Sequence, residues 1–210
     1  MRDNVDILEK YIENLVVKKN LLQTTVEAYK LDINEYLKFI KERNTLPEEY
    51  RIEASNKIFS LLEELDLFNK AERIFVFVGF GSEITTEIFI KKHLANKQIY
   101  VPKIVNGDMK LVNITRWDSL KPGHFNVLEP ESDDFYNGSV DLVITPSIVF
   151  NKQGYRLGYG KGYYDKYFSQ NNYKVSIGLS YDQLLQDNIP TEEHDQKVDF
   201  IITEKGIITC

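Results

Sequence analysis

The sequence has 210 residues and a net charge of −6, which suits one α/β domain and opposes non-specific binding to nucleic acid or anionic membranes. Its 42% hydrophobic and 28% charged residues are typical of a water-soluble globular protein. One cysteine, Cys210, excludes a disulfide framework, and no signal peptide or membrane-spanning run is evident, so we expect a cytoplasmic protein.

Hydrophobic periodicity predicts the elements in chain order. Apolar residues at helical spacing predict two helices within residues 5–39, separated by a break near residues 20–25. Downstream, the pattern alternates between short apolar runs and amphipathic stretches. It predicts helices at 47–65, 85–94 and 163–169, and strands at 73–78, 98–101, 110–115, 141–145, 173–179 and 198–203.

Strands that alternate with helices predict the α/β class: an open, mainly parallel sheet with helices on both faces, preceded by an atypical helical segment. We divide the chain into a helical extension, residues 1–31, and an α/β domain, residues 32–210. Ligands of such sheets bind at the carboxyl ends of the strands, so the loops there are the candidates for a site.

The loop after the strand at 141–145 carries the clearest chemical signal. Its glycines alternate with larger residues, which lets backbone N–H groups approach a bulky anion at the start of the next helix. Arg156 and Lys161 add positive charge, and we expect both outside the core. The pattern lacks the Ser or Thr that follows the lysine of a P-loop, and its third glycine is one residue early for a dinucleotide fold. The sequence predicts a phosphate cradle, with a strained structural turn as the alternative.

The full string Arg156-Leu-Gly-Tyr-Gly-Lys-Gly-Tyr-Tyr-Asp165 resembles the 5-formyltetrahydrofolate cyclo-ligase family. Further segments agree in order and spacing, and the resemblance covers roughly residues 32–210. These segments are Arg43-Asn-Thr-Leu-Pro-Glu-Glu-Tyr-Arg51, Ser82-Glu-Ile-Thr-Thr86, Val101-Pro-Lys103, Glu129-Pro130, Ile189-Pro190, His194-Asp195 and Val198-Asp-Phe-Ile-Ile-Thr-Glu204.

The resemblance implies a ligase that converts 5-formyltetrahydrofolate to 5,10-methenyltetrahydrofolate, with ATP split to ADP and phosphate and Mg²⁺ as the metal. It implies catalytic roles for Arg156 and Lys161, and substrate contacts for Val78, Glu83 and Tyr163. The metal ligands would be Asp165 and Asp199. The nucleotide would contact Arg156, Leu157, Gly158, Tyr159, Gly160, Lys161, Gly162, Tyr163 and Tyr164.

Structural roles remain open for several of these residues. Asp165 and Glu83 are each placed to cap a helix, and Tyr163 and Tyr164 suit a core. Asp199 lies in an apolar run, where a buried carboxylate must find a metal, a base or N–H donors.

The N-terminal segment departs from the family. The family's Lys-x-x-x-Arg pair, which contacts nucleotide phosphates, should fall near Leu31 and Glu35, and neither is basic. Lys30, Lys38 and Lys41 lie nearby and are possible replacements. Residues 1–40 weakly resemble the N-terminal core-binding segment of tyrosine recombinases. Two alternatives to the ligase follow: a non-catalytic folate- or nucleotide-binding protein, and a DNA-binding helical module fused to this fold.

Overall fold

The computed structural model describes residues 23–123 and 127–210, and side chains from residue 33 onward within them. The chain forms two compact units, Met1–Glu42 and Arg43–Cys210. Helix α2 (Gln23–Asn44) agrees with the second predicted helix, whereas the first falls outside the described residues. The division that we predicted between residues 31 and 32 falls inside α2, and it stays a prediction.

The second unit is built on an eight-stranded sheet in the order β12-β11-β10-β7-β1-β2-β3-β6, counted over the described residues. The five central strands pair in parallel, and the outer three pair antiparallel, which confirms the predicted mainly parallel α/β sheet. The parallel strands are β1 (Arg73–Val76), β2 (Gln98–Val105), β7 (Val140–Thr145), β10 (Tyr173–Leu179) and β11 (Phe200–Thr203). The antiparallel strands are β3 (Asp108–Ile114), β6 (Phe135–Tyr136) and β12 (Gly206–Thr209).

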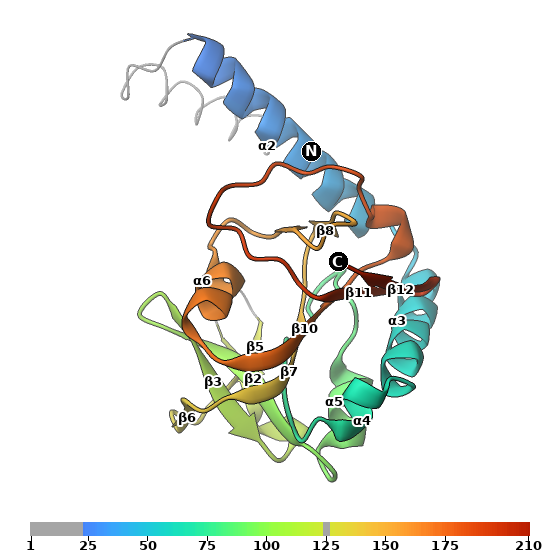
Figure 1. Ribbon diagram of the computed structural model, residues 1–210, viewed down its shortest axis with the longest axis vertical. Coiled ribbons are helices and arrows are strands. Elements are labelled where there is room, and N and C mark those ends of the chain that lie inside the picture. Colours follow the sequence, from blue (N-terminus) through green and yellow to red (C-terminus); the bar gives the residue numbers. More distant parts are fainter. Residues whose placement is uncertain (1–22, 124–126) are drawn as a thin grey trace. The chain divides into compact units, whose positions relative to one another are not determined.

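Helices lie on both sides of this sheet, as the sequence predicted (Figure 1). Helix α6 lies on one side, and α3, α4 and α5 lie on the other. Their bounds are α3 (Glu48–Glu63), α4 (Asp66–Lys70), α5 (Glu87–His93) and α6 (Tyr163–Gln170). Within residues 23–123 and 127–210, two small hairpins and two short 3₁₀ turns complete the fold: β4 (Leu120–Pro122) with β5 (Leu128–Pro130), β8 (Val149–Phe150) with β9 (Arg156–Leu157), and the turns at Trp117–Ser119 and Asp182–Leu184.

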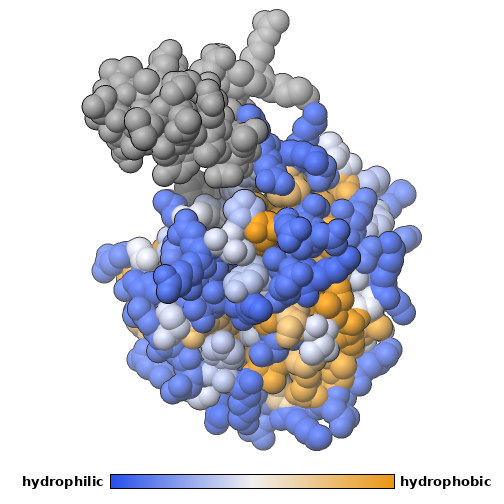
Figure 2. All heavy atoms as spheres, turned by 45° about the horizontal axis from the view of Figure 1, so that its top comes forward, coloured by the Kyte–Doolittle hydropathy of each residue, from blue (hydrophilic) through white to orange (hydrophobic). Residues whose placement is uncertain are grey.

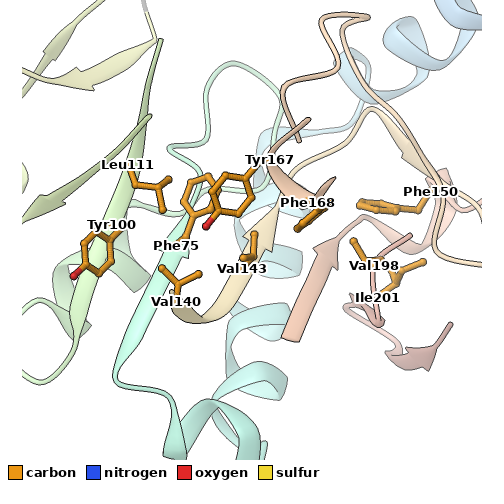
Figure 3. Packing of buried hydrophobic residues seen from close by; sticks show 10 residues of the cluster. All are labelled: Phe75, Tyr100, Leu111, Val140, Val143, Phe150, Tyr167, Phe168, Val198 and Ile201. Carbon is orange, nitrogen blue, oxygen red and sulfur yellow. The ribbon is translucent and has the colours of Figure 1, made fainter. Parts of the chain in front are cut away.

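The sheet face under α6 is packed with aromatic side chains (Figure 3). Phe75 of β1 and Val143 of β7 are fully buried beneath Tyr167 and Phe168 of α6. The rings of Phe75 and Tyr167 lie 5.0 Å apart, edge to face, while Tyr164 stacks on Phe75 with the centroids 5.8 Å apart. Burying each such side chain stabilises the fold by about 1.5–3 kcal/mol. The packing fixes α6 on the sheet, and with it the end of the glycine loop that precedes this helix.

The molecular surface is mostly polar in the orientation of Figure 2, where hydrophobic side chains gather in one region at the lower right. Among the described residues, no helix has both the length and the apolar character that a membrane crossing requires.

Candidate functional site

The glycine loop runs from the β8–β9 hairpin to the first residue of α6. Gly160 and Gly162 have φ of +74° and +62°, a backbone conformation that residues other than glycine rarely adopt. A Cβ built on Gly158, Gly160 or Gly162 would meet no atom within 4 Å, so the space above the loop is open. The eight-residue helix α6 begins there with unpaired N–H groups and its positive dipole end. Such a loop can accept an anionic group.

Arg156 lies at the base of this loop, and its environment corrects our expectation that it stays outside the core. Only 5% of its side chain is exposed. Its guanidinium donates to Oδ1 of Asp165 at 2.6 Å and to the carbonyl oxygen of Gln196 at 2.8 Å, and it lies 4.9 Å from the ring of Phe168. Burial lowers its pKa, although Asp165 opposes this effect. Arg156 thus joins α6 to the segment before β11, whereas Lys161 is exposed on the loop.

The two predicted metal ligands are held by different partners. Oδ1 of Asp165 accepts the bond from Arg156 and a second bond from the backbone N–H of Gln196 at 3.0 Å. Oδ2 of Asp199 accepts bonds from the N–H and the hydroxyl of Ser176, both at 2.8 Å. Asp199 is exposed and precedes β11, so our expectation of a carboxylate within a buried strand is wrong. The described residues hold no cluster of three His, Cys, Asp or Glu groups for a metal ion.

Glu83 is a buried carboxylate in the loop between β1 and α5. Because α5 begins only at Glu87, Glu83 does not cap this helix. Glu83 is 6% exposed, and its Oε1 lies 3.8 Å from Nη1 of Arg43. Burial raises the pKa of Glu83 to about 7, with Arg43 and an N–H bond from Phe80 acting in the opposite direction. Glu83 therefore titrates near neutral pH.

Arg43 is a site residue that the sequence analysis did not single out. Its Nε donates to the hydroxyl of Ser82 at 3.1 Å, and its Nη1 donates to the carbonyl oxygen of Ser147 at 3.0 Å. Its Nη2 donates to the hydroxyl of Tyr159, which lies in the glycine loop. The signal was present, since Arg43 opens the family-like segment at residues 43–51. Arg43 and Glu83 both line one small pocket.

Tyr163 lines a second, larger pocket between α6 and strands β3 and β6. This pocket also contains Tyr167, whose buried hydroxyl has no hydrogen-bond partner in the structure. Glu83 and Tyr163, both predicted to contact substrate, thus line different pockets. Val78 is 4% exposed and lines neither of these two pockets.

Comparison with known proteins now decides the family. The sequence profile of the 5-formyltetrahydrofolate cyclo-ligase family matches residues 28–204. The chain belongs to this family. Cyclo-ligases are ligases, and the recognition that we based on the glycine loop and its flanking motifs is confirmed.

Individual members of the cyclo-ligase family match along most of their length. A probable 5-formyltetrahydrofolate cyclo-ligase of Caenorhabditis elegans is 27% identical over 86% of this chain and 95% of its own. The mouse cyclo-ligase is 28% identical over 86% of this chain and 96% of its own. A relative in Arabidopsis thaliana is named mitochondrial, so our expectation of a cytoplasmic location stays a prediction.

Solved structures of the cyclo-ligase family share the fold. The 5,10-methenyltetrahydrofolate synthetase of Aquifex aeolicus superposes with a TM-score of 0.78 at 28% identity, covering 85% of this chain and 92% of that one. The synthetase of Mycoplasma pneumoniae has a TM-score of 0.63 at 20% identity, covering 80% and 94%, and supports the fold alone.

The N-terminal segment departs from the cyclo-ligase pattern at the position of the basic pair. The family match begins at residue 28, and the cyclo-ligases of mouse and Caenorhabditis elegans lend no support to the recombinase resemblance. Lys38 and Lys41 are exposed on α2, where Lys38 lies 3.8 Å from Glu42 one helical turn away. Lys30 has no described side chain.

We expect Glu83→Gln to remove a pH dependence of stability. The pKa of Glu83 is raised from 4.5 to about 7 in the folded protein. Between these values the native state keeps a proton that the unfolded state releases, so the free energy of unfolding falls as pH rises, by about 3 kcal/mol in all. Urea unfolding of wild type and variant at pH 4.5, 6 and 8 measures this, and the variant should lack that decline. Glu87→Gln, an exposed change on α5, is the control and should keep it. A decline that persists in Glu83→Gln would contradict the assignment.

Proposed function

We propose that this protein catalyses the ATP-dependent conversion of 5-formyltetrahydrofolate to 5,10-methenyltetrahydrofolate, releasing ADP and phosphate. The observation that carries the proposal is the open glycine loop at the start of α6, within a chain that matches the cyclo-ligase family over residues 28–204. Relatives in mouse and Caenorhabditis elegans are named 5-formyltetrahydrofolate cyclo-ligase or probable cyclo-ligase. This chain matches each of them over nearly its whole length.

The chemistry explains why a phosphate-binding loop is needed. A formamide is a poor electrophile, and its oxygen is a poor leaving group. The formyl oxygen attacks the γ-phosphorus of ATP, and the bond to ADP breaks. The N10 nitrogen then attacks the activated formyl carbon and loses its proton, and the carbon–oxygen bond breaks as phosphate leaves. Such phosphoryl transfer needs positioning and charge stabilisation rather than a protein nucleophile.

The residues of the loop suit these tasks. The N–H groups of residues 158–162 and the exposed Lys161 would hold the transferring phosphoryl group, and Lys161 would stabilise charge that develops on it. Arg156 would act from beneath the loop, since its side chain is buried against Asp165. Glu83 and Tyr163, which line different pockets, would supply the two contacts to the folate.

Magnesium would enter with the nucleotide and screen the phosphate charges. Asp165 is the better placed of the two predicted ligands because it lies in the first turn after the glycine loop. One carboxylate together with substrate phosphates and water is a common magnesium environment. Asp199, bonded to Ser176, is the weaker fit.

Asp165→Asn should lower turnover strongly and raise the magnesium concentration needed for half-maximal rate. Loss of the carboxylate removes a negative ligand and the partner of Arg156. Steady-state rates over a magnesium titration at fixed ATP measure the effect, with urea unfolding as a check on stability. Asp199→Asn is the matched control and should shift the titration little. Unchanged activity of Asp165→Asn at limiting magnesium would remove Asp165 from the metal site.

Turnover is the decisive test of the proposed function. The purified protein is incubated with 5-formyltetrahydrofolate and MgATP, and the absorbance of the methenyl product is followed beside phosphate release. One phosphate per methenyl product, and no product without ATP, is the expected result. Binding of both ligands without turnover would instead support a non-catalytic binding protein, an alternative favoured by the missing basic pair near residues 31 and 35. Salt-dependent DNA affinity would support the other alternative, a DNA-binding helical module fused to this fold.

A further inference from the structure

The glycine loop is connected to Glu83 through one buried side chain. Arg43 is 3% exposed and uses three of its nitrogen atoms on three different segments. Nε bonds Ser82, which adjoins Glu83, and Nη1 bonds the carbonyl of Ser147 after β7. Nη2 bonds the Tyr159 hydroxyl within the loop. Because a guanidinium presents its donors in a rigid plane, these segments are held in a fixed relative position.

Tyr159 is the point at which the loop is fixed. It lies between Gly158 and Gly160, and a glycine loop otherwise has many accessible conformations. The residue is 47% exposed, and its ring lies 5.6 Å from the guanidinium carbon of Arg43 and 5.8 Å from the ring of Phe80. The bond from a buried cation to the Tyr159 hydroxyl therefore restricts the conformation of the loop.

The guanidinium of Arg43 also faces Glu83. Its carboxylate lies 3.8 Å from Nη1 of Arg43, and its backbone carbonyl accepts a bond from Tyr181 at 3.1 Å. Arg43 lowers the pKa of Glu83 against the larger effect of burial, and thereby favours the carboxylate form at neutral pH. One cation therefore faces both the nucleotide loop and the proposed folate contact.

We propose that Arg43 is a positioning residue that fixes the glycine loop through Tyr159 while it orients Glu83, so that the nucleotide and folate sites share one anchor. The proposal rests on the proposed function for the identity of the two ligands. It predicts that the two contacts can be separated by mutation, because only one of them passes through Tyr159.

Tyr159→Phe removes the hydroxyl and leaves Arg43 beside Glu83. We expect the KM for MgATP to rise about tenfold, with the KM for 5-formyltetrahydrofolate and the pH profile unchanged. Arg43→Lys keeps a charge but cannot make the three planar bonds, so both KM values should rise and the pH profile should shift. Tyr100→Phe is the matched control: it removes a hydroxyl bonded to Gln98 at 3.0 Å and should change neither KM.

The double variant Arg43→Lys, Tyr159→Phe tests whether the two residues act as a unit. Its MgATP affinity should equal that of Arg43→Lys alone, since residues in one network are not additive. Direct titration with MgADP gives the same comparison without turnover, so failure of wild type to form the methenyl product would count against the function and not the anchor. MgADP affinity unchanged in Tyr159→Phe, or effects that multiply in the double variant, would overturn the proposal. If Arg43→Lys fails to fold, the Tyr159→Phe titration alone decides.

Discussion

Arg156→Ala is expected to lower the free energy of unfolding by about 3 kcal/mol, because it leaves the carboxylate of Asp165 without its charged partner. The side chain of Arg156 is 5% exposed and bonds both Asp165 and the carbonyl of Gln196. Because the site is buried, water does not easily take the place of the lost guanidinium. Urea denaturation followed by circular dichroism measures the change.

Two further variants sharpen this test. Arg116→Ala is the control, since Arg116 pairs with Asp118 where both side chains are more than half exposed, and it should cost less than about 1 kcal/mol. Arg156→Met combined with Asp165→Leu should recover much of the loss, because apolar groups can replace a buried ion pair. If Arg156→Ala unfolds at the same urea concentration as wild type, the pair does not hold the loop to the fold.

Lys161→Ala is expected to reduce turnover by about 100-fold while the free energy of unfolding changes by less than about 0.5 kcal/mol. Lys161 is exposed between Gly160 and Gly162, in the loop that we assign to the phosphates. The reduction should fall mainly on kcat, since the charge acts on the transferring phosphoryl group.

The matched control for this prediction is Lys152→Ala, an exposed lysine that pairs with Asp187 at 2.8 Å. It should keep the wild-type rate. A wild-type rate in Lys161→Ala as well would favour a purely structural turn over a phosphate cradle.

Much of the fold could be predicted because its signals are local. The strand at Tyr173–Leu179 agrees with its predicted bounds, and α6 differs by one residue, since alternation and helical spacing are read within a few positions. The two-residue strand β6 and the hairpin β8–β9 were missed, because such short strands exist through their partners and not through their own pattern.

The environment of the site residues could not be predicted in the same way. Arg156 looked exposed because its partner Gln196 lies 40 residues away in the sequence. Asp199 looked buried because apolar neighbours flank it, yet the strand begins one residue later and the carboxylate points to Ser176. The contact of Arg43 with Ser82 spans 39 residues, so the periodicity of neither segment predicts it.

The two outer strands of the sheet are short: β6 has two residues and β12 has four. An unpaired strand edge is a template on which a second chain can add a strand, and its hazard grows with its length and flatness. Here β12 pairs with β11 at four positions, whereas β6 pairs with β3 only at Leu111 and Val112, so β6 leaves most of the outer side of the seven-residue β3 uncovered. We therefore expect the β12 edge to resist sheet-to-sheet association, and any association of folded chains in concentrated solution to begin along β3.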